Sequence, residues 1–231
     1  MKVIGFIGAY DKTDMMLNVA KIITTLGKRV LMIDSTLNQK ARYVVPVINP
    51  TTSYITNFED IDVAVGFENL KQISQYLGSS EKELPYDILF VDTDTQERVE
   101  EFKLIEAQTN FFVTSFDIYS LKKGLEILSG IKENMSLTKV LFCQEILKED
   151  DDYLNFLSLT SKIIWNEYRI YFPLENGDLS VIAENQRVAK VKFKRLSAQY
   201  KDGILNIAQL IYPELGESDY RRAMKTIERG V

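Results

Sequence analysis

The chain has 231 residues, with 28 lysines and arginines, 33 aspartates and glutamates, no histidine and one cysteine. Without histidine, a Ser-His-Asp triad, a Cys-His dyad and a histidine-ligated metal are excluded. One cysteine excludes a disulfide framework and a multi-cysteine zinc site, and is typical of a reducing compartment. The net charge of −5 argues against a general nucleic-acid coat but allows a local basic patch.

The apolar segments predict no membrane anchor. Residues 3–8 are too few for a signal peptide or a membrane span, and no later segment has about 18 uninterrupted apolar residues. In residues 221–231 only Met224 and Ile227 offer apolar anchors, which bury too little area for stable attachment. We therefore expect a soluble, cytoplasmic protein with no stable membrane insertion.

Short segments rich in Val, Ile and Phe predict the β-strands. Most are apolar throughout rather than alternating, which is typical of a parallel sheet that helices cover on both faces. The predicted strands are residues 2–8, 29–34, 61–66, 87–92, 110–114, 139–143 and 167–173.

Between these strands, apolar residues three and four apart predict helices over residues 14–26, 68–77, 96–108, 118–134 and 152–164. Residues 38–57, with β-branched residues and two prolines, predict irregular structure or an edge hairpin. The alternation predicts one doubly wound α/β domain over residues 1–231, with a mostly parallel sheet. From about residue 196 to 231 we expect a helical C-terminal portion.

The first strand-to-helix turn has the setting of a phosphate-binding loop. Residues 8–13 are Gly-Ala-Tyr-Asp-Lys-Thr, and in open α/β sheets ligands bind where strand ends meet helix N-termini. A phosphate-binding loop ends in Gly-Lys-Ser/Thr in this setting. Lys12 and Thr13 supply the lysine and the hydroxyl.

Three segments together resemble the MinD/ParA group of deviant Walker ATPases. They are residues 8–13, GKRVLMID at residues 27–34 and YDILFVDT at residues 86–93. In that family the loop is KGGxGKTT, strand two ends in an Asp near the magnesium and the attacking water, and another strand ends in an Asp-Thr/Ser pair that senses the γ-phosphate. Residues 110–128 resemble the family's next strand and helix. Residues 167–173, with Asn185 onward, resemble its late strand and nucleobase-side loop.

For a working ATPase, the resemblance implies a specific set of site residues. The catalytic residues would be Lys12, Asp34 and Asp92, and the magnesium site would comprise Thr13, Asp34 and Asp92. The nucleotide-binding residues would be Gly8, Lys12, Thr13, Asp14 and Gln144.

The loop departs from the family pattern at four positions. Ile7 replaces the signature lysine, Ala9 the second glycine, Asp11 the glycine before the catalytic lysine, and Asp14 the second threonine. Asp11 adds a side chain and a negative charge where backbone N–H groups must approach a phosphate. Asp14 is predicted to N-cap the helix and occupy the donors that a phosphate needs. We expect weak ATP binding or none, no efficient hydrolysis and no cofactor, with ATP and Mg²⁺ as the alternative.

Three alternatives stay open around this loop. Lys12 either binds a nucleotide or pairs with Asp34 or Asp92 in the space that the nucleotide would fill. Residues 92–94, Asp-Thr-Asp, have a functional role, holding magnesium or sensing a γ-phosphate, or they form a solvated turn after a buried strand. Gln144 either contacts adenine or is an ordinary residue beside a buried Cys143.

One dense basic cluster occurs late in the chain, with Val191 and Phe193 interleaved. In partition-type relatives, a basic surface binds DNA through phosphate neutralisation, whereas a run of charges is otherwise a solvated face. The cluster consists of Arg187, Lys190, Lys192, Lys194 and Arg195.

Two functional hypotheses follow from the resemblance. The first is a non-hydrolysing docking, localisation or assembly factor that acts with protein partners, or as a homodimer, in a larger machine such as a pilus, secretion or conjugation apparatus. The second is a working MgATP switch in partition or positioning, with ATP-dependent dimerisation and DNA or a membrane protein as partner. The altered loop favours the first.

Overall fold

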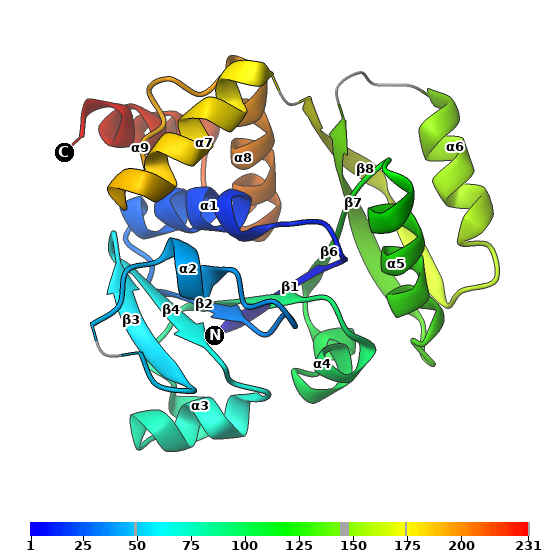
Figure 1. Cartoon of the computed structure of the whole chain (residues 1–231), viewed down its shortest axis with the longest axis horizontal. Helices are drawn as coiled ribbons and strands as arrows, with labels where there is room; N and C mark the ends of the chain where they lie inside the picture. Colours follow the sequence, from blue (N-terminus) through cyan, green and yellow to red (C-terminus); the bar gives the residue numbers. More distant parts are fainter. Residues whose placement is uncertain (49, 144–147, 174, 231) are drawn as a thin grey trace.

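The computed structural model describes residues 1–48, 50–143, 148–173 and 175–230, and their strands form one eight-stranded sheet (Figure 1). The order across the sheet is β3-β4-β2-β5-β1-β6-β7-β8. Only the β3–β4 pair is antiparallel, which confirms the predicted doubly wound, mostly parallel class. The strands are β1 (Lys2–Ile7), β2 (Val30–Asp34), β3 (Tyr54–Phe58), β4 (Ile61–Val65), β5 (Ile88–Thr93), β6 (Thr109–Ser115), β7 (Met135–Cys143) and β8 (Ile163–Pro173).

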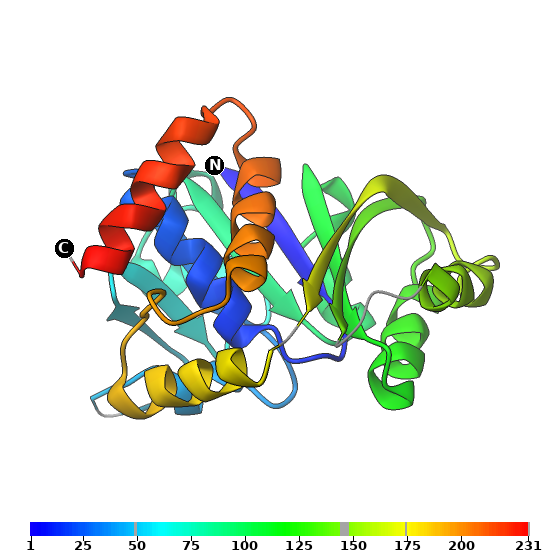
Figure 2. The ribbon, with the colours of Figure 1, turned by 90° about the horizontal axis from the view of Figure 1, so that it is seen from above.

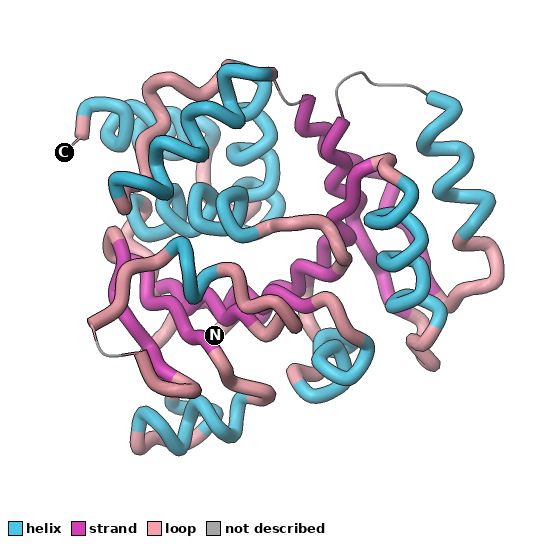
Figure 3. Tube along the Cα trace, viewed as in Figure 1, coloured by secondary structure: helices cyan, strands magenta, loops and turns pink. Residues whose placement is uncertain are grey.

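Helices cover both faces of this sheet (Figures 1 and 3). One face carries α1 (Thr13–Thr25), α2 (Ala41–Val44), α7 (Asn176–Val188), α8 (Ala198–Ile211) and α9 (Glu217–Arg229). The other carries α3 (Leu70–Leu77), α4 (Gln96–Glu101), α5 (Ile118–Ser129) and α6 (Lys148–Leu157), with short 3₁₀ turns at Glu81–Glu83 and Leu104–Glu106.

The two hydrophobic cores lie between these layers and the sheet. Central strands are apolar on both faces because each face is covered; every residue of β5 is buried. Phe6 of β1 stacks on Phe111 of β6 at a centroid distance of 5.1 Å, and meets Phe90 of β5 edge-on at 5.3 Å. This packing holds the central strands in a fixed register and so fixes where their carboxyl ends lie.

The segment at residues 38–57 combines both predicted alternatives. It contains the short helix α2, and it ends in β3, which pairs with β4 as an edge hairpin. Glu59 and Asp60 form the two-residue turn with φ angles of 54° and 67°. Positive φ at both positions gives the strand twist that a tight hairpin requires.

Several predicted helix boundaries were wrong. The helix predicted at residues 152–164 is α6, which begins and ends earlier, and Ile163 and Ile164 instead open β8. The helix predicted at 96–108 is interrupted at Lys103, whose φ of 53° turns the chain so that Phe102 and Leu104 are both buried. The helix predicted at 118–134 ends at Ser129, before Gly130. In each case tertiary packing overrides a local apolar period.

The segment after β8 was also misassigned. Asn185 was matched to a nucleobase-side loop, but it lies inside α7, and its Nδ2 donates to the carbonyl of Lys192 at 3.0 Å. The C-terminal portion predicted as helical, from about residue 196 to 231, contains the helices α8 and α9. None of the helices in the described residues combines the length and apolar character needed to cross a membrane.

Candidate functional site

Three neighbouring central strands end at the same edge of the sheet. In register, Asp34 at the end of β2 lies beside Asp92 of β5, and Ile7 at the end of β1 lies beside Thr93. The β1–α1 loop begins at this edge, so Lys12 and Thr13 come together with Asp34 and Asp92, and all four are buried. The structure thus assembles residues that are separated by up to 80 positions in the chain.

Gly8 starts the loop for a backbone reason. Its φ is +142°, and a Cβ at this position would lie 2.1 Å from the carbonyl oxygen of Val113 on β6. Only glycine fits this conformation and this close approach. The glycine is therefore required by the exit from β1, whether or not a phosphate binds.

Lys12 is enclosed by acceptors of its own chain. Its Nζ donates to the carbonyls of Gly8 at 2.6 Å and Tyr10 at 3.2 Å, and it lies 2.9 Å from Asp92 Oδ1. The side chain is 2% exposed. Two of the three N–H donors of the ammonium group thus meet loop carbonyls, and its charge faces Asp92. Of the two acids proposed to pair with Lys12, the partner is Asp92.

Asp92 is buried with few partners of its own. Among the described residues no donor is aligned for a hydrogen bond to its Oδ1, so the contact with Lys12 is an ion pair. Burial raises the pKa of Asp92 to about 7; the charge of Lys12 opposes this, and Asp34 and Asp11 add to it. A carboxyl with this pKa is divided between its charged and neutral forms near neutrality.

Asp11, not Asp14, occupies the helix N-terminus. Asp11 Oδ1 accepts the backbone N–H of Thr13 at 3.1 Å, and its other oxygen forms an ion pair with Lys40. The predicted N-cap role of Asp14 was wrong, because Asp14 already lies within the first turn of α1. Asp11 therefore takes a backbone donor that would otherwise face a bound anion.

Asp14 instead ties α1 to two other segments. Its Oδ2 accepts from Gln186 Nε2 of α7 at 2.8 Å and lies 3.4 Å from Lys40 Nζ. Burial raises the pKa of Asp14, and Lys40 opposes the rise. For Lys40, burial favours the neutral amine, but the bond to Asp11 and the two acidic charges outweigh it and raise its pKa. Lys40 thus offsets part of the negative charge of the loop.

Asp34 also bonds within its own chain. Its Oδ2 accepts the N–H of Ala41 at 2.8 Å, and its Oδ1 accepts the N–H and the hydroxyl of Thr36 at 3.1 and 2.6 Å. These bonds fix the turn that leads into α2. Beyond β5, the Thr93 hydroxyl donates to the carbonyl of Thr95 at 3.2 Å, and Asp94 Oδ1 accepts the N–H of Leu37 at 3.0 Å.

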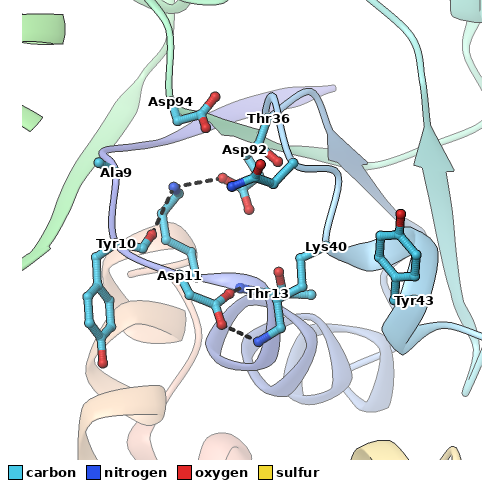
Figure 4. A pocket seen from close by; sticks show the side chains of 11 residues that line it. Ala9, Tyr10, Asp11, Thr13, Thr36, Lys40, Tyr43, Asp92 and Asp94 are labelled. Atoms are coloured by element: carbon cyan, nitrogen blue, oxygen red, sulfur yellow. Dashed lines mark hydrogen bonds and ion pairs between the residues drawn. The ribbon is translucent and has the colours of Figure 1, made fainter. Parts of the chain in front are cut away.

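A cavity of about 440 Å³ remains at this edge (Figure 4). Its lining carries three carboxylates, those of Asp11, Asp92 and Asp94, against the two ammonium groups of Lys12 and Lys40. Asp34 is not part of the lining, and no group of three or more acidic or cysteine side chains that suits a metal ion occurs in the described residues. As these side chains stand, they do not fit a magnesium–triphosphate, because both cations are already paired and the excess charge is negative.

The remaining predicted residues lie elsewhere or outside the described part. Gln144 is outside the described residues, and Cys143 ends β7 half-buried, with its thiol pKa raised by burial. In the basic cluster, Lys190 Nζ lies 3.0 Å from Glu59 Oε1 and Arg195 pairs with Glu184. Arg187, Lys192 and Lys194 are exposed, while Phe193 is buried between them. DNA binding by this cluster stays a prediction.

The sequence did not reveal two residues that close the site. Lys40 lies in the segment predicted as irregular, and Gln186 lies in a helix that was not predicted. Neither belongs to a motif. A lone lysine or glutamine carries no local signal of the partner that it will meet, so only the folded chain identifies them.

The order of the strands and the loop between β1 and α1 define the architecture of a P-loop NTPase of the MinD/ParA type. Solved structures of other proteins have the same fold. A ParA family ATPase from Chlorobium tepidum superposes with a TM-score of 0.60 at 15% identity, over 90% of this chain and 97% of the other. The MinC:MinD cell division complex of Aquifex aeolicus gives 0.59 at 12% identity, covering 94% and 98%.

A third similar structure is a Borrelia burgdorferi protein bound to AMPPNP, with a TM-score of 0.56 at 11% identity over 93% of this chain and 99% of that one. No protein-family profile and no curated protein sequence matches the chain. At these identities the likeness establishes the fold. The chain therefore has the MinD/ParA-type fold that its sequence motifs predicted.

Proposed function

We propose that this protein is a non-hydrolysing member of the MinD/ParA fold group that acts as a docking, localisation or assembly factor for protein partners. The observation that carries the proposal is the position of Lys12. Its ammonium group lies against two loop carbonyls and Asp92, in the place where a phosphate-binding loop holds a phosphate. A nucleotide would have to break these contacts before binding.

The charges around the loop support the same conclusion. Asp11 takes the N–H of Thr13, and its charge and that of Asp14 are met by Lys40. The loop is thus a self-contained ion-pair network, stable without a ligand. Such a network has no need of nucleotide to stay ordered, which suits a module that presents a constant surface.

The similar structures support a role with protein partners. One of them is a complex of two cell division proteins, MinC and MinD, and another is a ParA family ATPase. We extend association with a partner protein to this chain, and leave hydrolysis out, because the loop that would perform it is internally paired.

A second function is favoured by one observation. The cavity of about 440 Å³ is lined by Lys12, Thr13 and Asp92, and a similar structure holds AMPPNP. If Lys12 turned away from Asp92, these residues would face a nucleotide as in a weak MgATP switch. This alternative requires Lys12 to give up its ion pair with Asp92 and to bind a phosphate of the nucleotide instead.

A thermal-shift measurement separates the two functions. The protein is heated with and without 5 mM MgATP or MgADP, and the shift within each variant is compared. A ligand at 100 times its dissociation constant adds about 2.7 kcal/mol to the free energy of unfolding. We expect no shift for the natural sequence. A clear shift that Lys12→Ala removes would overturn the proposal.

The loop variant Asp11→Gly with Asp14→Thr serves as the matched gain-of-function control. It restores the residue types that the fold group has at these positions. If it binds MgATP and the parent does not, the two acids are what close the site. Isothermal titration of the parent with MgATP provides a second readout that does not depend on how stable each variant is.

A further inference from the structure

Helix α6 packs on the sheet through a mostly polar side. It lies at one end of the molecule, far from α9 (Figures 1 and 2). The side chains that contact the sheet follow the helical spacing of i, i+3, i+4 and i+7. They are Asp151, Leu154, Asn155 and, directly after the helix, Ser158, whose N–H bonds to the carbonyl of Leu154 and so continues the last turn. Leu154 is the apolar one of these four.

Two cations of the sheet meet this polar side of α6. Asp151 Oδ1 lies 2.6 Å from Lys139 Nζ of β7, and the other oxygen of Asp151 forms an ion pair with Arg169 of β8. Asn155 Oδ1 accepts from the same Lys139 Nζ at 2.5 Å. Lys139 and Asp151 are both buried, whereas the Arg169 side chain is 45% exposed. The buried lysine of the sheet thus receives its counter-charge from α6.

Helix α5, on the same face of the sheet, is held by apolar contacts instead. Its Leu121, Ile127 and Leu128 are buried, and a Cβ at Gly124 would lie 2.8 Å from the ring of Phe112. When a helix leaves the sheet, water does not replace apolar contacts. Water does replace hydrogen bonds, so their net contribution to packing is small. Helix α6 therefore gains less from packing on the sheet than α5 does.

The other apolar residues of α6 do not make up this difference. Tyr153 and Phe156 already face solvent at 44% and 67% exposure, and Leu157 is only partly buried. When α6 leaves the sheet, Lys139 and Asp151 regain water, and this gain in hydration offsets much of the lost attraction between them. The packing of α6 thus depends on few apolar contacts and on ionic groups for which water is a good substitute.

The strands beneath α6 carry an aromatic ring beside the two cations. Trp165 of β8 donates from Nε1 to Ser158 Oγ at 2.8 Å, and Lys139 Nζ lies 5.1 Å from the centroid of its ring. Lys139, Arg169 and Trp165 therefore form one surface, which we call the cationic surface. In the packed state Asp151 occupies it, with one cation at each of its carboxylate oxygens.

We propose that α6 is a detachable cover, which leaves β7 and β8 as one unit while the rest of the sheet stays folded. The packed helix masks the cationic surface, and only the detached state presents Lys139, Arg169 and Trp165 to water. Opening requires the loss of few apolar contacts, so it occurs without unfolding of the two cores. It does not involve the β1–α1 loop, so it proceeds whether or not that loop binds a ligand.

Hydrogen–deuterium exchange of the full chain at increasing urea concentrations tests this proposal. Amides that exchange by local opening respond little to urea, whereas amides that exchange only on global unfolding respond strongly. We expect residues 152–157 of α6 to exchange at least about tenfold faster than residues 122–129 of α5, with a smaller urea dependence. Equal rates and equal urea dependence in the two helices would overturn the proposal.

Trp165, the one tryptophan of the chain, reports on detachment separately from fraying of the helix. Leu154→Ala should raise the exchange rate of α6 at least about tenfold, by more than that of α5, and should also raise the quenching of Trp165 fluorescence by acrylamide. The matched control is Leu159→Ala, at a leucine that is 74% exposed, which should change neither readout. Faster exchange without greater quenching would mean that α6 frays in place, and would contradict the proposal.

Replacement of the buried ion pair tests the physical reason. Lys139→Met with Asp151→Leu exchanges the pair for apolar contacts, and should slow the exchange of α6 at least about tenfold. Asp151→Asn alone should speed it, because Lys139 then stays buried without its acid. The control is Asp152→Asn, at an exposed position of the same helix, which should leave the rate unchanged. Circular dichroism checks that each variant is folded. A double variant that exchanges as fast as the natural protein would contradict the proposal.

Discussion

Two regions of this molecule differ in how far their side chains are satisfied within the chain. At the carboxyl ends of β1, β5 and β2, Lys12 meets Asp92, and Lys40 meets Asp11 and Asp14. On the outer side of α6, Tyr153 and Phe156 face solvent, and so does Leu159 in the turn that follows the helix. The cations at the loop edge are thus paired internally, while the outer side of α6 leaves apolar area exposed.

The contrast indicates where binding is to be expected. An edge whose polar groups are already paired gains little from a ligand, because each new contact replaces an old one. A surface with exposed aromatic side chains gains from every contact that removes water from them. In this fold the strand edge is the usual place for a ligand, and this difference is the reason for the proposal that the protein acts through association with other proteins.

The largest expected effect follows removal of the buried ion pair at the loop. Lys12→Ala leaves Asp92 without its cation, and should lower the free energy of unfolding by about 3–5 kcal/mol in urea denaturation. The control is Arg221→Ala on α9, whose pair with Glu217 is exposed and should contribute under about 1 kcal/mol. Adding Asp92→Asn to Lys12→Ala should recover part of the loss. A loss below about 1 kcal/mol would show that the loop is not held by this pair.

The next effect concerns pH. The pKa of Asp92 is raised from 3.8 to about 7 in the folded state, so the folded chain binds this proton more tightly than the unfolded chain. Its contribution to stability is present in full below the unfolded pKa and is lost as pH rises through about 7. From pH 8 to pH 5, the natural protein should therefore gain stability over Asp92→Asn, on the order of 1–3 kcal/mol.

The measurement is the difference between the two urea unfolding curves at each pH. Asp94→Asn, at the same cavity, serves as the control and should give a curve parallel to that of the natural protein. If the difference between the natural protein and Asp92→Asn did not change with pH, the carboxyl of Asp92 would not be the titrating group.

A smaller effect is expected at Lys40. Its side chain is 37% exposed, so the ion pairs with Asp11 and Asp14 are partly screened by solvent. Lys40→Ala should lower the free energy of unfolding by about 1 kcal/mol. Lys123→Ala, at 38% exposure and paired with the exposed Glu126, should cost less. Equal losses for the two variants would mean that Lys40 acts as an ordinary surface charge.

The smallest effect on folding is expected on the outer side of α6. Phe156 is 67% exposed, so Phe156→Asp should change the free energy of unfolding in urea denaturation by no more than about 0.5 kcal/mol. A loss of several kcal/mol would show that Phe156 belongs to the core, and the contrast between the two regions would fail.

The amino-acid sequence by itself determined the class of fold and the place of the loop. Apolar strands such as residues 87–92 and 110–114 must be covered on both faces, which selects a parallel sheet between helix layers. It missed the end of α6 because Ile163 and Ile164 continue a helical spacing as well as they begin a strand.

Only the tertiary structure decided how the loop is closed. Asp34 and Asp92 are equally good partners for Lys12 on the sequence, but Asp34 is held by Ala41 and Thr36, which leaves Asp92 to face the lysine. Lys40 and Gln186 reach Asp14 from 26 and 172 residues away. Strand order and helix packing set such meetings, since an ion pair depends on distance in space and the local sequence does not contain that distance.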